Sequence, residues 1–182
     1  MILFLDFDGV LHPDSVYLEH RRPVVRGGGR LFMWAPHLLN SLAPHPQVKI
    51  VLSTSWVRVL GFSRARKALP EQLRTRVIGA TWHSRMGKSE FGGFRLPTSW
   101  WDDATRYQQI AGYVARAKLT RWLAIDDNCE GWPAELADQL ILTDSNRGIS
   151  DPAAWAKLRE RLAHWSLTCL NNPAQPLTYR AN

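Results

Sequence analysis

The chain is poor in cysteine, in long apolar runs and in acidic residues relative to basic ones. Its 182 residues contain two cysteines, Cys129 and Cys169, and neither lies in a Cys-x-x-Cys pair or a Cys/His cluster, so neither a zinc site nor a disulfide framework is expected. The apolar N-terminus is too short for a membrane span or signal peptide and contains Asp6 and Asp8. We therefore expect a cytoplasmic protein with no membrane partner.

Basic residues outnumber acidic ones by 23 to 16, which gives a net charge of +7. This excess favours anionic substrates. The charges are scattered rather than gathered in one run, so they point only weakly to nucleic acid.

Short apolar runs alternate with segments of helical character, which predicts an α/β fold with a central parallel sheet. The apolar runs are continuous, as expected for strands that are covered on both faces. The predicted strands are residues 2–6, 49–52, 77–80, 122–125 and 140–142. The predicted helices are residues 35–43, 63–74, 104–117 and 152–165, the last with Asp151 as N-cap and Pro152 in its first turn.

Two stretches do not fit the strand and helix pattern. Residues 12–34 contain three consecutive glycines and read as a flap or hairpin, and residues 82–103 read as a loop on the substrate side of the sheet. Both leave from carboxyl ends of strands, where open α/β sheets bind ligands. We expect one domain over residues 1–170, followed by a tail over 171–182.

The first predicted strand ends in Asp6-Phe7-Asp8-Gly9. Alternate residues of a strand share a face, so Asp6 and Asp8 lie together, and Gly9 permits a sharp turn after them. Paired carboxylates repel each other unless a cation lies between them, and Mg²⁺ prefers oxygen ligands. The alternative is that the two acids only cap the turn.

Two further strands end in polar groups. Ser53, Thr54 and Ser55 follow the strand over 49–52, where hydroxyls and free amides suit phosphate oxygens or an N-cap, or both. Asp126 and Asp127 follow the strand over 122–125. If this strand neighbours the first one, four carboxylates converge, which is hard to explain without a cation.

These motifs, in this order, resemble the haloacid dehalogenase (HAD) superfamily of phosphotransferases. The likeness covers about 120 residues and implies a Rossmann-like three-layer sandwich with only a small flap or cap. A narrower likeness is to the HAD domain of Swiss-army-knife RNA repair proteins. It rests on Asp6 to Leu11, Leu52 to Trp56, Ile78 to Thr81 and Ile125 to Asp127.

The chain departs from the superfamily at its usual lysine. Arg106 stands near that position and can bind a phosphoryl oxygen bidentately. Lys88 is an alternative for this role. Arg106 is equally able to form a structural salt bridge with Asp102 or Asp103.

The resemblance implies a Mg²⁺-dependent phosphatase with an aspartyl-phosphate intermediate. Asp6 is then the nucleophile, and Asp8 the general acid and base. Mg²⁺ is held by Asp6, by the Asp8 backbone carbonyl and by Asp126 or Asp127. The phosphoryl oxygens are bound by the hydroxyl cluster and by a cation, namely Ser53, Thr54, Ser55 and Arg106.

Three other residues have two interpretations each, and a fourth has one. His12 either touches substrate or forms part of a turn, and Cys129 is expected to be a small packing residue. Trp100 and Trp101 either stack a base or form the apolar part of their loop.

The substrate is expected to be a phosphorylated molecule. Short insertions leave the site open, which suits the phosphorylated ends of nucleic acids, although nucleotides and sugar phosphates are alternatives. One rival interpretation is a catalytically silent module that binds nucleic acid or protein. Another is a phosphotransferase whose acceptor is not water. The sequence specifies no partner protein, kinase or ligase, and no oligomeric state.

Overall fold

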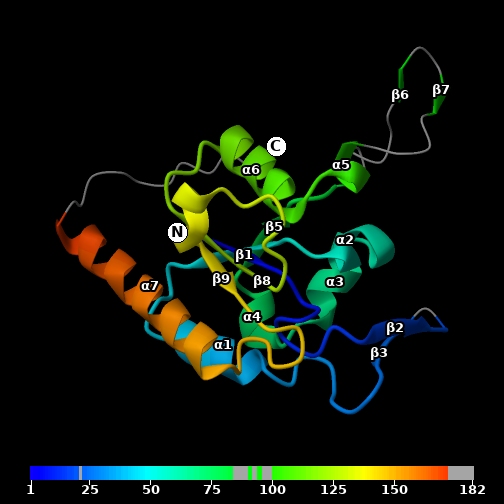
Figure 1. The fold of residues 1–182 in the computed structure, drawn as a ribbon, viewed down its shortest axis with the longest axis horizontal. Coiled ribbons are helices and arrows are strands. Elements are labelled where there is room, and N and C mark those ends of the chain that lie inside the picture. Colours follow the sequence, from blue (N-terminus) through cyan, green and yellow to red (C-terminus); the bar gives the residue numbers. More distant parts are fainter. Residues whose placement is uncertain (21, 84–89, 92–93, 96–99, 172–182) are drawn as a thin grey trace.

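The computed structural model describes residues 1–20, 22–83, 90–91, 94–95 and 100–171 (Figure 1). For residues 90–91, 94–95, 100, 102 and 166–171 it describes the backbone alone. Of the tail predicted over 171–182, residue 171 is the last residue of a helix, and residues 172–182 lie outside the described residues, as does Lys88.

Five parallel strands form the centre of the molecule, in the order β5-β4-β1-β8-β9. They are β1 (Ile2–Leu5), β4 (Lys49–Leu52), β5 (Val77–Ala80), β8 (Trp122–Asp126) and β9 (Leu140–Leu142). Every residue of β1 and β8 is buried, as continuous apolar runs predict. The predicted α/β fold with a central parallel sheet is confirmed.

Helices cover both faces of this sheet (Figure 1). One face packs against α1 (Ala35–Leu42), α3 (Phe62–Ala68), α4 (Glu71–Arg74) and α7 (Pro152–Asn171), and its core includes Leu3, Ile50, Leu123 and Ile141. The opposite face packs against α6 (Arg106–Ala117), with Phe4, Val51 and Ile110 in a second core. The result is a three-layer sandwich.

The register of the strands brings three carboxyl ends together. Leu5 of β1 is aligned with Leu52 of β4 on one side and with Ile125 of β8 on the other. The residues that follow these strands therefore emerge at one edge of the sheet, where the predicted site residues lie.

Two hairpins leave the sandwich. Strands β2 (Val16–Glu19) and β3 (Arg22–Val25) pair antiparallel within the predicted flap, and Figure 1 shows this hairpin projecting beside α2 (Ser55–Leu60). Strands β6 (Glu90–Phe91) and β7 (Phe94–Arg95) pair in the loop before α5 (Trp100–Asp103).

The helix predicted over 63–74 is wrong as a single element. Helix α3 ends at Ala68, and α4 begins at Glu71, because Pro70 between them is extended at φ −50 and ψ 144 and has no N–H to donate. Helix α6 begins at Arg106 rather than at residue 104, and α7 runs on to Asn171. A 3-10 helix, Ala134–Gln139, precedes β9. Among the described residues, no helix is long and apolar enough to cross a membrane.

Candidate active site

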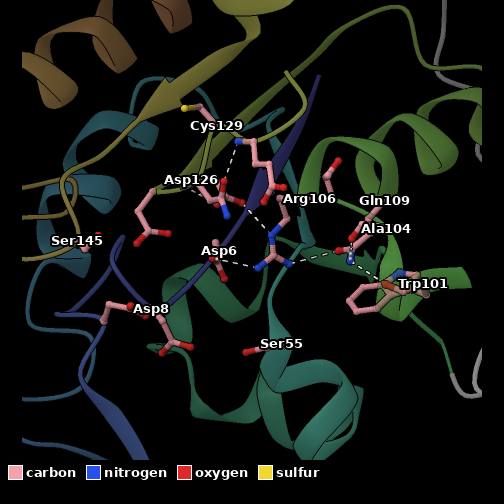
Figure 2. Close-up of a pocket in the computed structure, with 15 residues that line it drawn as sticks. Asp6, Asp8, Ser55, Trp101, Ala104, Arg106, Gln109, Asp126, Cys129 and Ser145 are labelled. Carbon is pink, nitrogen blue, oxygen red and sulfur yellow. Dashed lines mark hydrogen bonds and ion pairs between the residues drawn. The ribbon is translucent and has the colours of Figure 1, made fainter. Parts of the chain in front are cut away.

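A pocket of about 700 Å³ lies at the carboxyl ends of β1 and β8 (Figure 2). Acidic groups dominate its wall, together with one arginine from α6 and the first residue of α2. Most of the predicted site residues lie in this wall: Asp6, Asp8, Ser55, Arg106, Asp126 and Asp127.

Three carboxylates converge in this pocket. Asp6, Asp126 and Asp127 each offer an oxygen, and these oxygens lie within 4.8 Å of one another. Asp6 and Asp126 are buried, and Asp127 is half-buried. The backbone N–H of Phe7 donates to Asp6 Oδ1 (2.8 Å), and that of Asn128 donates to Asp126 Oδ1 (3.1 Å). Each buried carboxylate therefore has one oxygen held by the backbone.

This donor set fits a divalent cation such as Mg²⁺. All three ligands are carboxylate oxygens, which hard cations prefer. Asp126 Oδ2 is buried and accepts no hydrogen bond from the described residues, although the Arg106 guanidinium lies beside it. Gly9, at φ +67, leaves room for Asp127, because a Cβ on Gly9 would lie 2.2 Å from Asp127 Oδ2.

Burial disfavours the charged forms of Asp6 and Asp126. It raises the pKa of Asp6 from 3.8 to about 6, against the opposing effect of the Arg106 guanidinium, and the neighbouring Asp8 adds to the rise. Burial and the adjacent Asp6 also raise the pKa of Asp126 well above its usual value. A bound cation would reverse this effect by stabilising the carboxylates.

Arg106 is the cation that the described residues place in the site. Its NH2 lies 3.3 Å from Asp6 Oδ2, and its Nε lies 3.0 Å from Asp126 Oδ2 (Figure 2). Although its burial alone would lower the pKa of Arg106, the carboxylates, Asp6 foremost, raise it overall. Arg106 therefore forms ion pairs with Asp6 and Asp126, two acids of the pocket. The alternative from the sequence was a structural salt bridge with Asp102 or Asp103.

Two neighbours fix the position of Arg106 at the start of α6. Thr105 is the N-cap of this helix and forms a capping box with Gln108. Gln109 accepts a hydrogen bond from Arg106 NH1 (3.5 Å) and donates from Nε2 to the carbonyls of Trp101 and Ala104 (both 3.1 Å). The arginine is therefore oriented from two sides.

Asp8 is held apart from the three convergent carboxylates. Trp56 Nε1 donates to both of its carboxylate oxygens (3.0 Å each), and His12 Nε2 lies 3.0 Å from Oδ1. His12 Nδ1 accepts from the backbone N–H of Phe32 (3.4 Å), so the proton of the neutral ring lies on Nε2 and points at Asp8.

Sequence reasoning did not assign these two partners to Asp8. His12 is fully buried, so it is neither exposed to substrate nor only part of a turn. The one feature of the sequence that could have indicated the contact with Asp8 is the position of His12, four residues after Asp8 and next to a proline. Trp56 lies 48 residues away from Asp8, and only the fold brings the two together.

The three predicted phosphate-binding hydroxyls do not lie together. Ser55 lines the pocket, whereas Ser53 and Thr54 are buried and do not contribute to its wall. Thr54 is the N-cap of α2, and its hydroxyl accepts the backbone N–H of Trp56 (3.4 Å). The hydroxyl of Ser53 is buried and has no hydrogen-bond partner among the described residues. Phosphate binding by Ser53 and Thr54 stays a prediction.

Other pocket residues correct or extend the sequence analysis. Cys129 is exposed and lines the pocket, so its interpretation as a packing residue is wrong. Trp101 is buried and also reaches the pocket wall, whereas the side chain of Trp100 lies outside the described part. Asp14, which was not predicted, lines the pocket too. Partial burial and the nearby Asp127 raise its pKa.

The order of these residues along the chain matches a known family. The sequence profile of the HAD domain in Swiss Army Knife RNA repair proteins matches residues 2–154. The chain belongs to this family. The matched part of this HAD domain runs from β1 into the first turn of α7 and contains every residue of the pocket wall. No curated protein and no solved structure is significantly similar to the chain.

Proposed function

We propose that this HAD domain is a Mg²⁺-dependent phosphatase that forms an aspartyl-phosphate on Asp6. The observation that carries the proposal is the convergence of Asp6, Asp126 and Asp127 beside Arg106 in one pocket. A cluster of buried and half-buried carboxylates, with one arginine among the described residues, suits a cation together with an anionic substrate. Membership of the family supports phosphatase-type chemistry in RNA repair.

Asp6, Asp126 and Asp127 would hold Mg²⁺, together with the backbone carbonyl of Asp8. When bound, the ion offsets the charge between an anionic nucleophile and an anionic phosphate. The buried Oδ2 of Asp126, which faces the Arg106 guanidinium but accepts no hydrogen bond from the described residues, and the room beside Gly9 support this assignment.

The protein's own groups then divide the reaction into two steps. An oxygen of Asp6 attacks phosphorus, the bond from phosphorus to the leaving oxygen breaks, and Asp8 gives its proton to that oxygen. In the second step Asp8, now a carboxylate, takes a proton from water. The resulting hydroxide attacks the phosphorus of the aspartyl-phosphate and releases inorganic phosphate and Asp6.

Two groups would orient the substrate. Arg106 lines the pocket, and the remaining N–H groups of its guanidinium would bind phosphoryl oxygens. The hydroxyl of Ser55 lies in the same pocket and can donate one further hydrogen bond.

We propose phosphorylated nucleic-acid ends as the substrate. The net charge of +7 and the family's place in RNA repair support this class over neutral or cationic compounds. Nucleotides and sugar phosphates are the competing substrates in the test.

The test is phosphate release from phosphorylated DNA and RNA ends, nucleotides and sugar phosphates, with Mg²⁺ and with chelator. We expect turnover that requires Mg²⁺ and falls at least 1,000-fold, roughly the loss for a removed nucleophile, in Asp6→Asn. Asp138→Asn is the matched control, because Asp138 is 75% exposed and pairs with Arg161 away from the pocket.

Other outcomes would identify the rival functions. Oligonucleotide binding without turnover of any substrate would favour a silent binding module. Transfer of phosphate to an added alcohol or nucleoside, in place of its release, would favour a phosphotransferase.

A further inference from the structure

A second cavity, of about 160 Å³, lies between the flap hairpin and α2. Its wall is mainly apolar: the hairpin contributes Val16, Tyr17, Leu18 and Pro23, and α2 contributes Trp56, Val59 and Leu60. We call this cavity the flap groove. Asp8 and Ser55 line both the flap groove and the main pocket, so the two cavities meet at these residues.

The flap groove holds an unusual share of the exposed apolar surface. Six large apolar side chains are exposed among the described residues, and three of them line this groove: Tyr17 (50% exposed), Leu18 (52%) and Val59 (58%). Scattered exposed apolar residues need no explanation, but a cluster beside a polar pocket is typical of a ligand surface.

Tyr17 is presented as a fixed aromatic platform. The guanidinium carbon of Arg26 lies 4.6 Å from the centre of the Tyr17 ring. Arg26 is itself held by Glu19, whose Oε1 accepts from Nε (3.2 Å) and NH2 (3.0 Å). An aromatic ring beside a cation is the combination that binds single-stranded nucleic acid by stacking and by charge.

We propose that the flap groove binds the base of the terminal nucleotide whose phosphate enters the main pocket. This inference rests on the proposed function. Asp8 protonates the leaving oxygen, so the group attached to that oxygen must lie next to Asp8. The flap groove begins there, and its apolar wall suits a planar base, whereas a sugar phosphate has no apolar part to fill it.

The test compares nucleic-acid ends that differ only in the terminal base. The substrates are one oligonucleotide phosphorylated at its 5′ or its 3′ end, and the same two molecules with an abasic terminal residue. The wild-type chain should prefer each base-containing end that it cleaves. Tyr17→Ala should lower kcat/KM about tenfold more for the base-containing end than for the abasic end, as expected for the loss of one stacking contact.

Three variants control this comparison. Tyr17→Phe keeps the ring and should keep the preference for a base, whereas Val59→Asp places a charge in the groove and should reduce it as Tyr17→Ala does. Phe62→Ala removes another exposed ring, on α3 outside the groove, and should leave the preference unchanged.

The failure of this inference differs from the failure of the proposed function. A wild-type chain that cleaves base-containing and abasic ends equally well, or groove variants that slow both ends equally, would overturn the flap groove as a base site while the phosphatase stands. A wild-type chain that releases phosphate from neither end would overturn the substrate on which both rest.

Discussion

Asp6 is an acid whose ionised form the fold disfavours. Its pKa is about 6 in the folded chain against 3.8 for an unperturbed aspartate, mainly because of burial. The unfolded chain thus releases this proton near pH 4, and the folded chain keeps it until about pH 6. Between these values the free energy of unfolding falls as the pH rises, and it stays lower above them. The difference corresponds to about 3 kcal/mol at pH 7.

Replacing Asp6 by Asn should therefore stabilise the metal-free chain at neutral pH. We expect the free energy of unfolding at pH 7.5, measured by urea denaturation in chelator, to rise by about 3 kcal/mol, a figure that already includes the attraction between Asp6 and Arg106. At pH 4 the gain should vanish, because wild-type Asp6 is then protonated in the folded state. A variant less stable than wild type at pH 7.5 would mean that the ion pair outweighs burial.

Gly9 should be needed for Mg²⁺ binding as well as for the turn. A Cβ at this position would meet Asp127 Oδ2 at 2.2 Å, so Gly9→Ala must displace a candidate metal ligand. We expect Mg²⁺ affinity, measured by calorimetric titration, to fall more than about tenfold, the weakening typical when a metal ligand loses its orientation.

Gly27→Ala separates this clash from backbone strain. Gly27 has a similar positive φ, +80, but beyond its chain neighbours no atom of the described residues lies within 4 Å of the position of its Cβ. Both variants should lose about 1–2 kcal/mol of stability from the left-handed backbone. Equal Mg²⁺ affinity in the two variants would contradict a role of Asp127 in metal binding.

Helix α6 places the arginine of the site, and its N-cap secures that placement. Thr105→Ala removes the capping box and should lower the free energy of unfolding by about 1 kcal/mol. It should also lower kcat/KM, because Arg106 is the first residue of the helix. Denaturation and phosphate release measure the two effects.

Asp151→Ala is the matched control for this helix cap. Asp151 caps α7 by accepting the backbone N–H groups of Ala153 and Ala154, and it does not line the pocket. It should cost similar stability with no change in kcat/KM. If the two variants were equally active, the cap of α6 would have no role in positioning Arg106.

The elements around the site differ in how far the sequence predicts them. The apolar runs of β1 and β8 predict that Asp6 and Asp126 meet if the two strands are neighbours, because parallel neighbours end at the same edge. The structure supplies that pairing. The break between α3 and α4 could have been predicted from Pro70, because proline ends a helix even where the apolar spacing continues. The Asp8–Trp56 contact could not have been predicted, since it depends on the order β4-β1 and on the start of α2.

Hydroxyl residues show a second limit of sequence reasoning. Ser53, Thr54 and Ser55 are consecutive, and their types suit both phosphate binding and helix capping. Only the position at which α2 begins decides that Thr54 is the cap and that Ser55 reaches the pocket. If α2 began one residue earlier or later, a different hydroxyl would cap the helix and a different one would reach the pocket. The residue types alone do not determine where the helix begins.

The strand order of the whole molecule explains why one edge of the sheet collects the chemistry. Strand β1 is central, with β4 on one side and β8 on the other, so its carboxyl end receives groups from both neighbours. The flap follows β1 directly and packs against α2, which follows β4. The main pocket and the flap groove are thus both consequences of one crossover pattern, and a substrate that fills both contacts segments that lie far apart along the chain.

The net charge of +7 makes a prediction that concerns the substrate as a whole. A polyanionic end would displace bound counterions from its phosphates when it meets a basic surface, and salt would oppose this binding. If two phosphates of a single strand are contacted, kcat/KM for a phosphorylated oligonucleotide should fall about sevenfold between 50 and 200 mM KCl at constant Mg²⁺. Ribose 5-phosphate, with a single phosphate, should be less sensitive. If kcat/KM fell equally for both substrates, salt would act only on binding of the terminal phosphate. That result would argue against contacts between the protein and the rest of the oligonucleotide.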